Sequence, residues 1–300
     1  MGHNIPYLKK GDTVGVITPS RYVFDHKEKI ENAINTLKEA GFTIKIGSCF
    51  DGRKFFSSGD RKDRAIEINE MFADKEVKAI FCSIGGDTCN QLLDILDYDL
   101  IRRNPKFFIG YSDITNLILA IYQKTGITTF HGPNLNLIPD LNANSISQLL
   151  WLLSGEPRDI NYLPKFHVIK HGYAEGRLLG GNLFVVNGLI KTEYLPTLEG
   201  SILFWEEIDE GQSAVEYQIY QLNINGILSS ISGMVIGHIH KPGHESTPIL
   251  EETLLKLTHK YHYPILKTDS FGHGVKEFTT FPIGAMATID TKKKIFSWEQ

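Results

Sequence analysis

Short apolar segments alternate with amphipathic helical segments through the first half of this 300-residue chain. The predicted strands are residues 13–18, 43–47, 78–84, 106–111 and 127–130. The predicted helices are 26–40, a helix that begins at Asp60 and buries Ile66, Ile68, Met71 and Phe72, a helix that carries Leu92, Leu93 and Leu96, then 113–124 and 144–153. Alternation of apolar strands with helices is typical of a parallel sheet that helices cover on both faces. We therefore expect an α/β fold.

The second half also mixes helices and strands, but its sheet topology does not follow from the pattern. Its predicted segments are a helix that Gly180-Gly181-Asn182 opens and that ends near Ile190, strands 201–206 and 233–240, helices 214–227 and 247–261, and short β segments near 264–268, 285–290 and 295–299. A polar stretch with little periodicity separates the halves. We expect an N-terminal domain of residues 1–153, a linker of residues 154–178 and a smaller C-terminal domain of residues 179–300.

Composition excludes several function classes. The net charge of −4 shows no signature of polyanion binding, so we do not expect a nucleic-acid partner. No apolar run approaches the roughly 18–20 residues of a membrane span, so we expect no membrane partner. Three cysteines without a C-x-x-C pair are typical of a reducing compartment, and the N-terminus has no apolar signal region. These features predict a cytoplasmic protein.

Ser112 lies where the predicted strand 106–111 passes directly into the predicted helix 113–124. A serine on such a sharp turn is typical of a nucleophile elbow, and the helix N-terminus supplies N–H groups for a developing oxyanion. The match to G-x-S-x-G is incomplete, because Ile114 replaces the second glycine while Gly110 retains the first. The alternative is an N-cap serine, which is common wherever a helix starts.

Gly85-Gly86-Asp87 follows the strand 78–84 and forms a second strand-to-helix junction. Ligands of open α/β sheets bind at the carboxyl ends of strands, where both junctions lie. The backbone N–H groups of the two glycines could complete an oxyanion hole with that of Asp113. The alternative is an ordinary tight turn. No dinucleotide or Walker A glycine motif is present.

A serine nucleophile needs a base that an acid orients. Glu206 and Glu207 end an otherwise apolar strand, and only one of them can face a shared site because successive strand residues point to opposite faces. A solvated strand end is the alternative. His273, in a glycine-flanked loop, is a candidate base, and His131 is either a second candidate or a structural residue.

A third histidine group, His238-Ile-His240-Lys-Pro-Gly-His244, permits a metal site, because alternation places His238 and His240 on one face. No carboxylate or cysteine has supporting spacing, so we predict neither a metal nor a cofactor. Cys82 and Cys89 flank the glycine turn and fit core positions.

Several motifs occur together in a characteristic order: Gly-Asp-Thr-Val-Gly-Val-Ile-Thr-Pro-Ser (11–20), Ile-Gly-Gly-Asp (84–87), Gly-Tyr-Ser-Asp-Ile-Thr (110–115), Phe-His-Gly-Pro (130–133), Gly-Gly-Asn-Leu (180–183), Ile-Leu-Phe-Trp-Glu-Glu (202–207), Gly-His (272–273) and Phe-Pro-Ile-Gly (281–284). In these motifs the chain resembles the LD-carboxypeptidase family of serine peptidases, which also contains the microcin C immunity peptidases. The resemblance covers nearly the whole chain.

The resemblance implies a Ser–Glu–His triad of Ser112, Glu206 and His273. It places the oxyanion hole at the backbone N–H groups of Gly86 and Asp113. It further implies a Rossmann-like N-terminal domain, a smaller C-terminal α/β domain, a catalytic site between them and a homodimer. Further substrate contacts are expected from Gly85, Asp87, Tyr111, Asn182 and Trp205.

The substrate that the resemblance implies is a small peptide, a murein tetrapeptide cleaved at the LD-peptide bond before its terminal D-amino acid in cell-wall recycling. Murein-type members usually carry Arg-Gly-Gly-Tyr-Gly, whereas Ile-Gly-Gly-Asp-Thr-Cys-Asn (84–90) is closer to the immunity peptidases, which cleave a peptidyl or aminoacyl nucleotide. The short stretch 154–178 lacks the longer aromatic loop of that branch and favours the murein peptide. A catalytically silent ligand-binding homologue is the alternative of another class.

Overall fold

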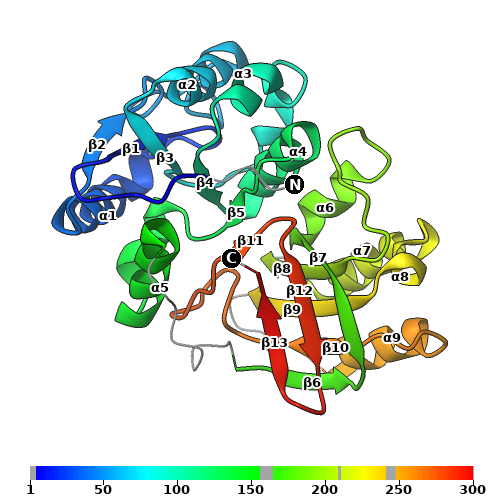
Figure 1. Ribbon diagram of the computed structural model, residues 1–300. Coiled ribbons are helices and arrows are strands. Elements are labelled where there is room, and N and C mark those ends of the chain that lie inside the picture. The colour runs from blue at the N-terminus through cyan, green and yellow to red at the C-terminus, as the bar shows by residue number, and fades with distance from the viewer. Residues whose placement is uncertain (1–4, 156–164, 209–210, 241–247, 300) are drawn as a thin grey trace. The chain divides into compact units, whose positions relative to one another are not determined.

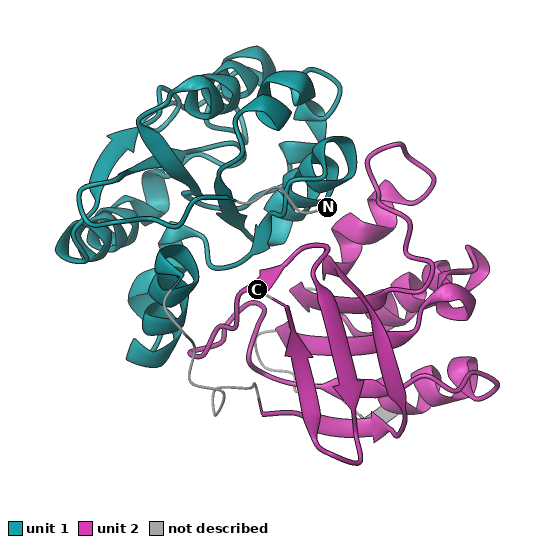
Figure 2. Cartoon of the chain, viewed as in Figure 1, with its two compact units in different colours: residues 1–158 teal, residues 159–300 magenta. Residues whose placement is uncertain are grey.

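The computed structural model describes residues 5–155, 165–208, 211–240 and 248–299. The chain forms two compact units, residues 1–158 and 159–300 (Figure 2). The division falls within the stretch predicted as the linker.

Unit 1 contains the predicted parallel sheet. Its strands are β1 (Thr13–Ile17), β2 (Thr43–Ile46), β3 (Val77–Cys82), β4 (Phe107–Gly110) and β5 (Phe130–His131). They lie in the order β5-β4-β3-β1-β2, and every neighbouring pair is parallel. The α-helices are α1 (Lys27–Glu39), α2 (Arg61–Ala73), α3 (Tyr98–Arg103), α4 (Thr115–Thr125) and α5 (Ala143–Ser154). Short 3-10 helices are η1 (Phe24–His26), η2 (Cys89–Leu92), η3 (Ser112–Ile114) and η4 (Leu135–Asp140).

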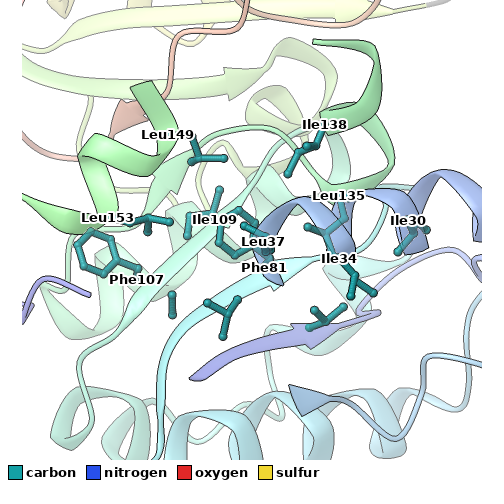
Figure 3. Packing of buried hydrophobic residues seen from close by; sticks show 14 of the residues in the cluster. Ile30, Ile34, Leu37, Phe81, Phe107, Ile109, Leu135, Ile138, Leu149 and Leu153 are labelled. Atoms are coloured by element: carbon teal, nitrogen blue, oxygen red, sulfur yellow. The ribbon is translucent and has the colours of Figure 1, made fainter. Parts of the chain in front are cut away.

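Helices cover both faces of this sheet, as predicted (Figure 1). One face packs against α1, η4 and α5 through a cluster of buried apolar side chains (Figure 3) that includes Ile30, Ile34, Leu37, Phe81, Phe107, Ile109, Leu135, Ile138, Leu149 and Leu153. On the opposite face, Phe72 of α2 stacks on Phe108 with ring centroids 5.8 Å apart. Because period-2 alternation sends Phe107 and Phe108 to opposite faces, a fully apolar β4 serves both layers.

Two local predictions for unit 1 are wrong. Ile66 is 51% exposed, because it lies on the solvent side of α2 while Ile68 and Met71 lie on the buried side. The leucines 92, 93 and 96 are buried but do not share one helix. The chain instead makes the single turn η2, then further turns, and α3 begins only at Tyr98, after Asp97 accepts the N–H of Leu100 as its N-cap. The spacing of these three leucines reflects their burial and not a shared helix.

Unit 2 is built on a seven-stranded mixed sheet in the order β13-β12-β7-β8-β9-β10-β6. The strands are β6 (His167–Lys170), β7 (Tyr173–Asn182), β8 (Ile202–Ile208), β9 (Gly233–His240), β10 (Ile265–Lys267), β12 (Met286–Asp290) and β13 (Ile295–Trp298), and β11 (Phe281–Pro282) is a further short strand. The run from β7 to β10 is parallel, and β6, β12 and β13 join antiparallel. The helices are α6 (Leu183–Leu189), α7 (Gln212–Ile224), α8 (Ile227–Ser230) and α9 (Pro248–Thr258).

The sequence prediction missed β6 and the long β7, which occupy part of the stretch read as a linker. Gly180-Gly181-Asn182 ends β7, and Asn182 is the N-cap of α6, the helix that this motif was predicted to open. Gly180 has a φ of +148°, and a Cβ there would lie 1.7 Å from the carbonyl oxygen of Phe204. Only glycine allows β7 to approach β8 so closely.

Candidate active site

Ser112 occupies the turn between β4 and α4 and has a φ of +64°. This left-handed conformation is disfavoured for a residue with a Cβ and costs of order 1–3 kcal/mol. Such strain persists only where surrounding structure imposes it, and it is typical of functional turns. The sequence predicted the sharp strand-to-helix turn, and the backbone at Ser112 has the conformation of a nucleophile elbow.

Gly110 explains why the incomplete G-x-S-x-G motif still folds as an elbow. A Cβ at Gly110 would lie 2.6 Å from Cγ2 of Ile114 and 3.0 Å from Oδ1 of Asn134. The Ile114 side chain therefore occupies the space that the missing side chain at position 110 leaves. Position 110 must therefore be glycine, whereas position 114 can carry a bulky side chain. One glycine is enough for this tight turn.

Asn134 holds the elbow from the neighbouring strand connection. Its Oδ1 accepts the backbone N–H of Tyr111 at 3.2 Å, and its Nδ2 donates to the carbonyl of Tyr111 at 3.3 Å. The side chain is 1% exposed. This paired contact fixes the residue that precedes Ser112. The sequence analysis did not single out Asn134, although a polar residue directly after the Phe-His-Gly-Pro motif was the available signal.

Gly85 and Gly86 bring the loop after β3 against the elbow. A Cβ at Gly85 would lie 3.0 Å from Cβ and 3.1 Å from Oγ of Ser112. Gly86 has a φ of +151°, and a Cβ there would lie 2.4 Å from Oγ of Ser20. Both positions therefore need glycine, one for close approach and one also for backbone conformation. The backbone of this loop lies next to the Ser112 hydroxyl, as an oxyanion hole requires.

The Asp113 carboxylate ties this loop to the elbow, a role the sequence analysis did not assign. Its Oδ2 accepts the Ser20 hydroxyl at 2.5 Å and the backbone N–H groups of Thr88 and Cys89 at 2.8 and 2.9 Å. Its Oδ1 accepts Nδ2 of Asn116 at 2.9 Å. A buried carboxylate is stable when donors satisfy its oxygens in this way.

Arg64 lies below these loops and is almost wholly buried. Its Nη1 donates to the carbonyl of Pro19 at 2.7 Å and to Oγ1 of Thr88 at 3.0 Å. Burial lowers the pKa of the guanidinium, although Cys89 and Asp113 oppose that shift. The sequence signal for Arg64 was its helical spacing from Ile68, which puts an arginine on the buried face of α2.

His131 and Tyr111 lie in the interior of unit 1. His131 is fully buried and Tyr111 is 5% exposed, and their rings pack edge to face with centroids 6.1 Å apart. This packing favours the structural interpretation of His131. Asp87, by contrast, is exposed at the tip of the glycine loop.

In unit 2, Nδ1 of His273 lies 2.6 Å from Oε2 of Glu206. Glu206 is fully buried near the end of β8, and the His273 side chain is 12% exposed. Because an ionised carboxylate only accepts hydrogen bonds, this contact places the proton on Nδ1 and leaves Nε2 as the basic nitrogen. The solvated strand end considered from the sequence is therefore wrong for Glu206.

The glycines on either side of His273 allow this contact. Gly272 has a φ of +114°, and a Cβ there would lie 3.0 Å from Cβ of Glu206. Gly274 has a φ of +73°, and a Cβ there would lie 2.3 Å from Nδ1 of His240. The loop therefore lies flat against the ends of β8 and β9, which larger residues would prevent.

Glu207 points to the other face of β8, as alternation requires. Its carboxylate accepts Nδ2 of Asn182 and the backbone N–H of Phe184, each at 2.8 Å, at the start of α6. Burial raises the pKa of Glu207 to about 7, and the nearby Glu206 charge adds to this shift. Trp205 is fully buried, so its side chain packs inside the unit.

The remaining candidates from the sequence are the histidine group 238–244 and the two cysteines near the glycine turn. His238 Nδ1 lies 2.9 Å from Oδ1 of Asp269, while His244 lies outside the described residues. Within the described ranges, no group of three or more His, Cys, Asp or Glu side chains could hold a metal ion. Cys82 and Cys89 are buried, and burial raises the pKa of both thiols.

Across the described part of the chain, no helix is long and apolar enough to cross a membrane.

Comparisons with known proteins match both units. The family model described as "LD-carboxypeptidase N-terminal domain" matches residues 14–132, and "LD-carboxypeptidase C-terminal domain" matches residues 175–289. A "Probable murein peptide carboxypeptidase" of Bacillus subtilis (strain 168) is 33% identical over 96% of this chain and 91% of the relative. The "Microcin C7 self-immunity protein MccF" of Escherichia coli is 30% identical over 97% and 94%.

Solved structures are similar along the same length. MccF in complex with glutamyl sulfamoyl guanosine has a TM-score of 0.87 at 29% identity, with 98% of each chain covered. A muramoyltetrapeptide carboxypeptidase from Oxalobacter formigenes has a TM-score of 0.79 at 26% identity, covering 95% of this chain and 97% of that one.

Proposed function

The chain belongs to the LD-carboxypeptidase family, and we propose that it is a serine carboxypeptidase acting on a murein tetrapeptide. It hydrolyses the LD-peptide bond before the terminal D-amino acid. Ser112 is the nucleophile, His273 is the general base and acid, and Glu206 orients His273. Ser112 comes from unit 1 and the other two residues come from unit 2, so the proposal requires both units.

The proposed reaction follows the chemistry of a serine triad. The Ser112 hydroxyl attacks the scissile carbonyl while Nε2 of His273 takes its proton. The backbone N–H groups of Gly86 and Asp113 stabilise the oxyanion. The C–N bond then breaks, and His273 gives the proton to the departing amine of the D-amino acid. Water activated by His273 hydrolyses the resulting ester and regenerates Ser112.

The observation that carries this proposal is the 2.6 Å contact between Glu206 and His273. A buried carboxylate on Nδ1 selects the tautomer in which Nε2 is basic, and it stabilises the imidazolium that forms after proton transfer. The Ser112 elbow and the glycine loop beside it supply the nucleophile and the oxyanion donors. Competent groups at all three positions argue against the catalytically silent homologue.

The murein substrate is supported by the name of the B. subtilis relative and by the shortness of the stretch 154–178. A free D-amino acid is a small leaving group and needs no extended loop. We place the reaction in the cytoplasm, where recycled muropeptides are trimmed. The family resemblance also leads us to propose a homodimer, which light scattering of the purified protein tests.

A second candidate function is cleavage of the amide between an amino acid or peptide and a modified nucleotide. Two observations favour it: the TM-score of 0.87 to MccF against 0.79 to the muramoyltetrapeptide carboxypeptidase, and the Gly-Gly-Asp-Thr-Cys-Asn sequence of the loop. Both candidates use the same triad and differ only in the group that leaves.

Mass spectrometry of two parallel incubations separates them. The purified protein is incubated with the LD-tetrapeptide and, separately, with glutamyl sulfamoyl guanosine, and Ser112→Ala is the matched control. We expect release of D-alanine from the tetrapeptide and almost none of L-alanine from its LL counterpart, since a misplaced carboxylate leaves site donors unpaired. Faster cleavage of the nucleotide would overturn the murein assignment, and cleavage of neither compound would overturn both.

A further inference from the structure

Two charged side chains next to Gly86 remain unexplained by the triad: Arg21 and Asp87. Both are exposed, and neither has an ion-pair or hydrogen-bond partner for its side chain among the residues that the structure describes. Of the other basic side chains in this part of unit 1, Lys27 pairs with Asp51, Lys54 with Asp60 and Arg61 with Asp94. Arg53 lies over the ring of Tyr22, 4.4 Å from its centroid. Arg21 is therefore an exposed cation that forms no ion pair with the residues that the structure describes.

The position of Arg21 is fixed relative to the elbow. Its backbone N–H donates to the carbonyl of Gly85 at 3.2 Å. A Cβ at Gly86 would lie 2.9 Å from Cβ of Arg21, and a Cβ at Gly85 would lie 3.0 Å from Cβ of Ser112. The base of the Arg21 side chain thus lies beside the glycine loop that packs on the nucleophile, at the carboxyl edge of β1 and β3.

We propose that Arg21 binds the terminal carboxylate of the substrate and so limits cleavage to the last peptide bond. This inference rests on the proposed carboxypeptidase function. When the scissile carbonyl lies at Ser112 and Gly86, the carboxylate of the leaving residue is only one residue further along, about 3.8 Å from Cα to Cα. A guanidinium pairs with a carboxylate through two parallel hydrogen bonds, which also fixes the orientation of the terminal residue.

The negative charge of Asp87, the residue after Gly86, influences where a substrate carboxylate can bind. The Asp87 carboxylate repels a second negative charge, so a substrate carboxylate is attracted to Arg21 rather than to Asp87. Arg64 is the other cation near the loop, but it is buried and donates to protein carbonyls. Arg21, by contrast, is exposed beside the glycine loop.

The test is a cycle of two substrates and two proteins. The murein tetrapeptide with a free terminal carboxylate is compared with the same peptide ending in D-alanine amide, using wild type and Arg21→Ala. We expect wild type to favour the free acid by roughly 10- to 100-fold in kcat/KM, the range for a hydrogen bond between charged groups. Arg21→Ala should lose that preference, mainly through KM, while its rate on the amide stays unchanged.

Two further variants sharpen the result. Arg103→Ala removes an exposed arginine that precedes the amino end of β4, at the opposite edge of the sheet, and should keep the wild-type preference. Arg21→Lys should keep part of it, because lysine retains the charge but not the paired hydrogen bonds. An unchanged acid-to-amide ratio in Arg21→Ala, or no such preference in wild type, overturns the inference. Failure of wild type to cleave the free acid at all overturns the proposed function instead.

Discussion

The carboxylate of Asp113 accepts the backbone N–H of Thr88 at 2.8 Å, although 25 residues separate the two. The same oxygen accepts the N–H of Cys89 and the hydroxyl of Ser20. The residue after the nucleophile therefore joins three loops at the carboxyl edge of the sheet. It couples the strained Ser112 turn to the glycine loop that the proposed oxyanion hole requires.

We expect Ser112→Ala to lower kcat by roughly 10³-fold or more, because removal of a triad nucleophile abolishes the covalent pathway. Turnover of the LD-tetrapeptide by mass spectrometry measures this. Thermal unfolding should change little, because serine and alanine both carry a Cβ and are equally disfavoured by the left-handed backbone at position 112. Near wild-type turnover by the variant would refute the assignment.

Glu206→Gln should lower activity far more than Glu207→Gln. The first change removes the charge that stabilises the imidazolium of His273, whereas Glu207 contacts Asn182 and Phe184 on the other face of β8. We expect Glu207→Gln to act chiefly on stability, by about 1–3 kcal/mol, because its amide cannot accept all the same donors.

Steady-state kinetics and thermal melts of the two variants, measured together, separate these effects. The reverse ranking of kcat would show that Glu207 is the orienting acid.

Asp113→Asn should lower kcat by roughly 10- to 100-fold with a smaller change in KM. The amide presents N–H groups to backbone donors, so the loop that carries Gly86 loses its anchor and the oxyanion donor is misplaced. Asn90→Ala is the control, because Asn90 lies in η2 directly after the same loop but is exposed, and the kcat of this variant should stay near wild type. Equal kcat values for the two variants would contradict the anchoring role.

Glu67 predicts a pH dependence of stability. Its buried carboxylate accepts the N–H groups of Thr18 and Cys49, and burial raises its pKa to about 7 from 4.5. Between these values the unfolded chain has released a proton that the folded chain retains, so the free energy of unfolding falls as pH rises from about 4.5 to 7. The contribution of this group is on the order of 3 kcal/mol at most.

Urea unfolding of wild type and Glu67→Gln from pH 4.5 to 8 measures this contribution as the difference between the two curves. The difference should change with pH up to about 7 and stay constant above it. A constant difference over the whole range would show that Glu67 does not titrate with the raised pKa.

Sequence periodicity predicted the secondary structure best where one face of an element is apolar. The helix 26–40 was predicted from its apolar face, and strands β1 to β4 were predicted because a parallel sheet requires continuous apolar strands. The predicted strand 127–130 overlaps β5 only at Phe130, and the α/β fold is confirmed. The prediction of a helix around Leu92 was wrong. Leucines that are buried in several consecutive turns can have the same sequence spacing as leucines on one face of a helix. The strand β7 was missed because it contains three glycines, which hide its alternation.

The sequence by itself determined the strand, turn and helix around Ser112, the glycines beside it and the opposite orientation of Glu206 and Glu207, because these depend on residues close in the chain. The contact of Glu206 with His273, which the family resemblance implied, is a tertiary contact, and only the tertiary structure decided that Asp113 anchors the glycine loop and that Asn134 contacts Tyr111. Each of these contacts joins residues separated by more than twenty positions. Periodicity specifies a face of one element, but the partner of that face depends on how strands are ordered and how loops pack at the edge of the sheet.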